Sequence, residues 1–177
     1  MPDTESLLAT LMSSGWHVTR RGRSGNLLPD QVKMRYSRLP VGVEWFLGDL
    51  EACVNRNETV WFLTHSDYSQ NRDGHFRWNE YELMSLDAAG SDHEEVNRIR
   101  AFWDCHFPFM FAVYSDYDYL AFDLNPEFCG QIVHGYTPEP EQPCPVALHL
   151  SVRPNTTLNP SGQTTGLEME AHSRQPG

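Results

Sequence analysis

Several features that often reveal function are missing from this sequence. No apolar stretch approaches the ~20 residues that a membrane-spanning helix requires, so we expect no transmembrane segment. The first residues, MPDTESLLATLMSSG, carry acidic side chains where a secretory signal carries basic ones, so we expect no signal peptide. The four cysteines lie far apart and form no CxxC pair, which favours reduced thiols in a cytoplasmic protein. These are Cys53, Cys105, Cys129 and Cys144.

The sequence also lacks the spacing of the common catalytic and metal-binding motifs. The eight histidines include no HxH, HExxH or HxxxH pair. There is no zinc-type cysteine spacing, no GxSxG nucleophile and no glycine-rich phosphate loop after a strand. Cys105 and His106 are adjacent, but neighbours at a helix end point in different directions and do not form a thiol–imidazole dyad. We therefore expect neither catalysis nor a bound cofactor.

Basic residues are scarce. The chain has 13 Lys and Arg against 24 Asp and Glu, a formal charge of −11. This balance argues against nucleic acid or an anionic membrane as the partner, because both would repel the protein. Residues 1–38 hold six basic and three acidic side chains, whereas residues 39–150 hold five arginines and nineteen acidic residues. A body this acidic suits a basic protein partner, although acidic surfaces also serve solubility alone.

The residues that are present predict a globular protein with several helices. Hydrophobic residues make up 40% of the 177 positions and aromatic residues 12%, which is enough for the core of one domain. Apolar side chains at helical spacing predict helices over 4–14, 41–54 and 91–103. The last of these begins with a Ser91–Glu94 pair that resembles a capping box. Tryptophans that fall in the amphipathic elements are expected in the core: Trp45, Trp61, Trp78 and Trp103.

Short β-type runs predict a sheet. Residues 59–65 form a strand-like run that a polar loop follows. Three further runs, 109–114, 119–124 and 131–136, are separated by short turns and therefore predict an antiparallel meander. Helices first and hairpins last, without alternation of strand and helix, indicate an α+β fold. Residues 149–177 are polar and rich in Pro, Gly and Thr, so we expect a disordered tail after a folded region over 1–148.

Two acidic patterns have a metal-binding or catalytic alternative. FMFAVYSDYDYLAFDL contains Asp116, Asp118 and Asp123, which could bind a metal or act as acid and base. We favour turn positions for Asp116 and Asp118, and the more polar face of a strand for Asp123. The segment 69–80 (SQNRDGHFRWNE) has the oxygen-ligand spacing of an EF-hand calcium loop, with Ser in place of the first Asp. A strand-like run precedes it where a helix is required, so a polar loop is favoured.

Five ordered segments carry a resemblance to a known family: ETVWFL (58–63), SDY (66–68), FRWNEYELMSL (76–86), FWDCHFPFMFAV (102–113) and GQIVHGYTPEPE (130–141). Together they resemble the SUKH superfamily, which holds bacterial immunity proteins and a fungal cell-wall synthesis regulator. The resemblance spans residues 36–148 and implies an α+β fold with a curved, mostly antiparallel sheet and packed helices in a single domain. One departure is that similar proteins follow Val146-Ala147 with a short helix, whereas LHLSVRPNTTLNPSG is a poor helix former.

The resemblance implies a binding protein without catalytic residues. Immunity proteins of this type bind a cognate polymorphic toxin domain, often a basic nuclease, and neutralise it inside the cell. Acidic and aromatic side chains are therefore expected at the interface. The candidate partner-binding residues are Asp67, Tyr68 and Asp73 in an exposed loop, Asp92, Glu94 and Glu95 at a helix start, and Asp116, Tyr117 and Asp118 at a hairpin tip. The alternatives are a regulatory scaffold that binds signalling proteins, and a metal-dependent hydrolase built on the two acidic patterns.

Overall fold

The computed structural model describes residues 4–22, 28–40, 42–69, 76–114 and 117–149. The helices in these ranges are α1 (Thr4–Ser13), α2 (Asp30–Arg35), α3 (Val43–Asp49), α4 (His65–Ser69), α5 (Glu80–Ala89) and α6 (His93–Asp104). The strands are β1 (His17–Arg20), β2 (Leu50–Val54), β3 (Val60–Phe62), β4 (His106–Val113), β5 (Tyr117–Asp123), β6 (Gln131–Tyr136) and β7 (Cys144–His149). The predicted α+β class is confirmed.

The seven described strands form one sheet in which spatial order follows chain order, from β1 to β7. Each neighbouring pair is antiparallel. The pairing of β4 with β5 runs from His106↔Asp123 to Val113↔Tyr117, and β6 continues the ladder on the other side of β5. The antiparallel meander predicted for this part of the chain is therefore confirmed, and β7 adds a strand within the segment 144–149.

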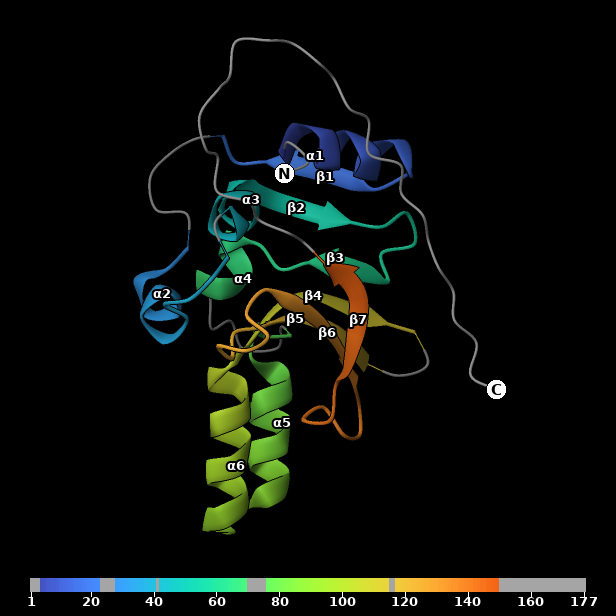
Figure 1. Ribbon diagram of the computed structural model, residues 1–177. Coiled ribbons are helices and arrows are strands. Elements are labelled where there is room, and N and C mark those ends of the chain that lie inside the picture. Colours follow the sequence, from blue (N-terminus) through green and yellow to red (C-terminus); the bar gives the residue numbers. More distant parts are fainter. Residues whose placement is uncertain (1–3, 23–27, 41, 70–75, 115–116, 150–177) are drawn as a thin grey trace, which may run out of the picture.

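The helices lie around the sheet in separate groups (Figure 1). Helices α5 and α6 stand side by side at one end of the molecule, and α1 lies along β1 at the other. In α6, the Asp92 side chain accepts hydrogen bonds from the backbone N–H groups of Glu94 and Glu95, each at 3.1 Å. Asp92 is thus the N-cap. The helix begins at His93, two residues after the predicted start at Ser91. None of the helices in the described part of the chain has both the length and the apolar character needed to span a bilayer.

An aromatic core joins the helix pair to the sheet. The Tyr81 ring of α5 lies 5.0 Å from Tyr119 of β5 and 5.1 Å from Phe111 of β4. Trp103 of α6 lies 5.1 Å from the same Tyr119 ring. These four residues are each at most 2% exposed. Trp45 on α3, in contrast, is 61% exposed, so its predicted place in the core is wrong.

Four of the seven tyrosines are buried in this core. Each of the four hydroxyls donates a hydrogen bond to a backbone carbonyl. Burial raises the pKa of each phenol above its ordinary value, and burial also raises the pKa of the Cys53 thiol to about 11. The four buried tyrosines are Tyr36, Tyr68, Tyr81 and Tyr119.

These buried groups predict a loss of stability at alkaline pH. In the unfolded chain they ionise near their ordinary pKa values, about 8.5 for Cys and 10 for Tyr, while the folded protein keeps them neutral. The unfolded state therefore loses protons first, and the free energy of unfolding falls as pH rises above about 8.5 and more steeply above 10. Urea unfolding between neutral pH and about pH 10.5 measures this fall. Ultraviolet absorbance should show at most three of the seven tyrosines ionised while the protein stays folded, and a larger number would contradict the prediction.

Candidate functional site

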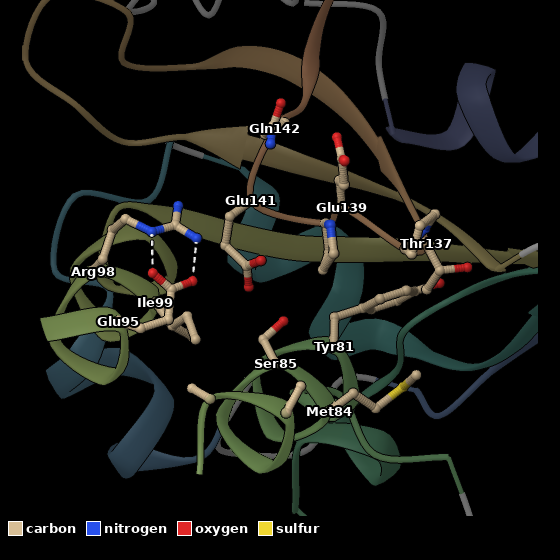
Figure 2. A pocket seen from close by; sticks show the side chains of 14 residues that line it. Tyr81, Met84, Ser85, Glu95, Arg98, Ile99, Thr137, Glu139, Glu141 and Gln142 are labelled. Carbon is tan, nitrogen blue, oxygen red and sulfur yellow. Dashed lines mark hydrogen bonds and ion pairs between the residues drawn. The ribbon is translucent and has the colours of Figure 1, made fainter. Parts of the chain in front are cut away.

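A groove lies between α5, α6 and the loop that connects β6 to β7 (Figure 2). It has a volume of about 490 Å³. Its side chains combine an apolar floor with carboxylates, and they come from two consecutive helices and from a loop that lies more than 30 residues further along the chain. The lining includes Met84, Ser85 and Ala88 of α5, Arg98 and Ile99 of α6, and Glu139 and Glu141 of the loop.

Two buried aromatic side chains hold the loop against the helix pair. The Tyr119 hydroxyl donates to the backbone carbonyl of Pro140. The indole Nε1–H of Trp103 donates to Oε1 of Glu141 at 2.8 Å. Because both rings are packed in the core, these bonds fix the wall of the groove before any ligand arrives.

A glycine makes room for one of these anchors. Tyr119 and Gly135 are register partners on β5 and β6. A Cβ atom at position 135 would overlap three atoms of the Tyr119 side chain, including its hydroxyl oxygen. The absence of a side chain at Gly135 therefore lets the Tyr119 ring cross β6 and reach the loop beyond it.

The charges in the groove do not balance. Arg98 forms two hydrogen bonds to Glu95, from Nε to Oε2 at 2.9 Å and from Nη2 to Oε1 at 2.5 Å. These bonds lower the pKa of Glu95. The Glu141 carboxylate points into the groove, as Figure 2 shows, and accepts a hydrogen bond from a neutral N–H donor. Its charge also helps to raise the pKa of Arg98, without a hydrogen bond between the two side chains. Glu139 is exposed at the edge, and no side chain in the described ranges pairs with it.

The predicted residues at the start of α6 are at or near this groove. Glu95 lines it through its ion pair with Arg98. Asp92 is exposed, and its carboxylate caps the helix. Glu94 is exposed. The start of α6 therefore places acidic groups on the surface, as predicted, and one of them is part of the groove.

The predicted hairpin residues lie beside the opposite end of the groove. Tyr117 is 42% exposed and stacks on Phe76 at 5.7 Å. Its carbonyl accepts a hydrogen bond from the N–H of Thr137, one of the residues that line the groove. Asp118 is half-buried, with Oδ2 3.8 Å from Nε2 of His134. Asp116 lies outside the described residues.

The prediction of an exposed loop after β3 is partly wrong. Residues 65–69 form α4, and Tyr68 is 1% exposed, with its ring stacked on Phe107 at 5.3 Å. Tyr68 therefore belongs to the core and cannot contact a partner. Asp67 accepts hydrogen bonds from the backbone N–H and the hydroxyl of Thr64, at 2.7 and 2.8 Å, and so stabilises the start of α4. Asp73 lies outside the described residues.

The structure changes the position assigned to the last of the three aspartates. Asp123 is 8% exposed, so its predicted place on the more polar face of a strand is wrong. Its Oδ1 accepts two hydrogen bonds from Asn125, and its Oδ2 lies 3.9 Å from Nε2 of His106. Among the described residues, no group of three or more His, Cys, Asp or Glu side chains is placed to hold a metal ion. Six residues of the EF-hand-like segment, 70–75, lie outside the described ranges.

Sequence reasoning did not single out the loop side of the groove. Glu139 and Glu141 occur in the segment GYTPEPE, where proline and glutamate alternate between two strands. That alternation indicates a stiff, acidic connection, and it could have marked the loop as a surface that presents carboxylates. Met84 belongs to the run NEYELMSL (79–86), whose pattern fits a strand or a helix, so the sequence alone does not place it on the face of a helix.

No family model, no curated protein and no solved structure matches this chain. The groove, its unbalanced charge and the acidic surface around it are therefore the features from which a function is proposed.

Proposed function

We propose that this chain is a non-catalytic immunity protein of the SUKH type, which binds a cognate polymorphic toxin domain and neutralises it. The observation that carries this proposal is where the negative charge lies. Glu82 and Asp123 are the only acidic side chains buried among the residues that the structure describes. The excess of carboxylates is therefore at the surface, where it attracts a basic protein and accelerates association with it.

The sequence resemblance and the fold support the same proposal independently of charge. The resemblance implies an antiparallel sheet with packed helices, and the chain has this architecture. A nuclease-like toxin domain is the partner that fits best, because a protein that holds a polyanion is basic. The acidic surface then competes with the nucleic acid for the same cationic groups.

Co-expression tests the proposal directly. Toxin domains encoded beside the gene for this chain are expressed in a sensitive bacterium, with and without the chain. We expect the chain to restore growth against at least one of them, and we expect that domain to be basic. An unrelated protein of similar size and charge is the control. Failure to rescue growth against every neighbouring toxin domain would reject the proposal.

Stoichiometry separates a binding protein from an enzyme that inactivates the toxin. With purified components, a binder inhibits in proportion to its amount and reaches full inhibition at one equivalent in a one-to-one complex. An enzyme acting on the toxin would inhibit at far less than one equivalent, with a delay. We expect the first behaviour, together with slower association at high salt, because salt screens exposed charges.

A further inference from the structure

We propose that the groove between α5, α6 and the loop 137–142 receives an arginine side chain from the protein partner, with apolar neighbours of that arginine resting on Met84 and Ala88. The inference rests on the proposed function only for the identity of the partner as a toxin domain. The chemistry of the occupant comes from the groove itself.

The charge of the groove selects a cation. Glu141 points into the space, and its position is fixed by the indole N–H of Trp103 at 2.8 Å. The nearest cation that lines the groove, Arg98, is already engaged by Glu95 through two hydrogen bonds. Exposed Glu139 adds a second carboxylate at the edge. Glu141 acts on Arg98 through its charge alone, so an incoming guanidinium would form the hydrogen-bonded, charge-assisted pair with Glu141 that no cation of the described chain forms.

The apolar part of the groove favours a long side chain that has apolar residues next to it in the partner's sequence. Met84 is 43% exposed, and Ala88 and Pro138 are exposed beside it. Arginine places its methylene stem on such a surface while its planar head pairs with carboxylates. The volume of about 490 Å³ lies within the ~300–1,000 Å³ range of ligand pockets, so it exceeds the needs of one side chain. A short segment that carries an arginine between apolar residues fits this space.

The groove is also preorganised, which favours measurable affinity for a small ligand. Two of its walls are helices, and the third is tied to the core by Tyr119 and Trp103. The walls of the groove and the Glu141 side chain therefore need little ordering when a ligand binds.

The test uses the full chain and two capped peptides, Gly-Leu-Arg-Leu-Gly and the same peptide with citrulline in place of arginine. Binding is measured by isothermal titration calorimetry. We expect saturable binding of the arginine peptide at up to millimolar concentration, and at least roughly tenfold weaker binding of the citrulline peptide, because citrulline has no charge. Equal binding of both peptides, or no saturable binding of the arginine peptide, would overturn the inference.

Matched variants locate the binding site. Glu141→Gln keeps an oxygen for the Trp103 indole and removes the charge, while Ala88→Trp fills the groove from the exposed face of α5. Each substitution is expected to weaken binding of the arginine peptide at least roughly tenfold. Glu51→Gln on β2 and Asn97→Trp on α6 are the controls, because both residues are exposed and neither lines the groove. Peptide affinity that is unchanged in Glu141→Gln and Ala88→Trp would place the ligand elsewhere and reject the groove.

A second readout separates this inference from the proposed function. If the wild-type chain neutralises a toxin domain and both groove variants neutralise it equally well, the groove inference fails and the proposed function stands. If the groove variants lose peptide binding and toxin binding together, the groove inference and the proposed function are both supported. If the peptide binds in the groove and no toxin domain is neutralised, the proposed function fails and the groove remains a site for arginine-bearing segments.

Discussion

Replacing Arg35 with leucine is expected to lower the free energy of unfolding by about 3–5 kcal/mol, because it leaves a buried carboxylate without its partner. Arg35 of α2 donates from Nη1 and Nη2 to the two oxygens of Glu82, at 2.7 and 2.8 Å, and from Nε to Asp104 at 2.8 Å. Glu82 is 6% exposed. The guanidinium also lies 5.4 Å from the Tyr36 ring and 5.9 Å from the Trp78 ring.

The pKa of Arg35 agrees with a strong interaction at this position. Burial has the largest single effect and lowers the pKa of Arg35, but the hydrogen bonds to Glu82 and Asp104 and the charge interactions with Glu82 and Tyr36 together outweigh it and hold that pKa above its ordinary value. The guanidinium therefore stays charged under all conditions in which the protein folds. It connects α2 to both α5 and α6, the two helices that form the groove.

Urea unfolding measures the effect, and two further variants control for it. Lys33 is two residues away on the same helix, and its Nζ lies 3.1 Å from an exposed Asp30. Lys33→Leu should cost less than about 1 kcal/mol, since exposed ion pairs contribute little. The double variant Arg35→Leu with Glu82→Leu should regain much of the lost stability, because no buried charge remains unpaired. A cost for Arg35→Leu no larger than that of Lys33→Leu would contradict the prediction.

Gly135→Ala is expected to destabilise the fold by roughly 3 kcal/mol, although it adds a single methyl group. The new Cβ would occupy the space of the Tyr119 side chain, whose ring is 1% exposed and packed between Tyr81 and Trp103. The ring can move only by losing these contacts and its hydrogen bond to Pro140. We therefore also expect the groove to lose its shape and its affinity for the arginine peptide.

A double-mutant cycle distinguishes this clash from a general intolerance of glycine substitution. Removing the ring with Tyr119→Leu should make Gly135→Ala nearly neutral, which gives a coupling energy of a few kcal/mol. Gly15→Ala provides the contrast, because nothing lies within 4 Å of its Cβ position and its cost comes from a φ of +86°. Its cost should not change in the Tyr119→Leu background. Additive effects of Gly135→Ala and Tyr119→Leu would exclude the clash.

Helices and strands with clear hydrophobic periodicity could be predicted from the sequence. The helix α6 and the strands β4, β5 and β6 have clear periodicity and short connections, and the structure contains them near the predicted bounds. The predicted helix over 41–54 ends at Asp49 because the chain turns into β2 there. Leu50 and Cys53 satisfy a helical pattern, yet both pack against Leu8 of α1 from a strand. A short apolar run does not distinguish a helix from a buried strand.

The positions that sequence reasoning missed depend on contacts between distant segments. Tyr68 is flanked by polar residues and looks exposed, but it is buried against Trp78 and Phe107. Asp123 alternates with apolar residues, yet packing covers both faces of β5 at that end. The short connection between α5 and α6 indicates that these helices are neighbours, but the groove also requires the loop after β6 to meet them, and no local pattern reveals that contact.

The order of strands in the sheet has a consequence for how the protein is made. Because each described strand pairs with the one before it, a chain leaving the ribosome can add strands to one growing edge without inserting any between two that are already paired. The longest interruption is between Phe62 and His106, where the chain forms α4, α5 and α6 before β4 returns to β3. Closing that excursion carries the largest entropic cost of any strand pairing in the sheet. The helix pair is therefore synthesised before β4 can pair with β3, which is the pairing that joins the two parts of the sheet.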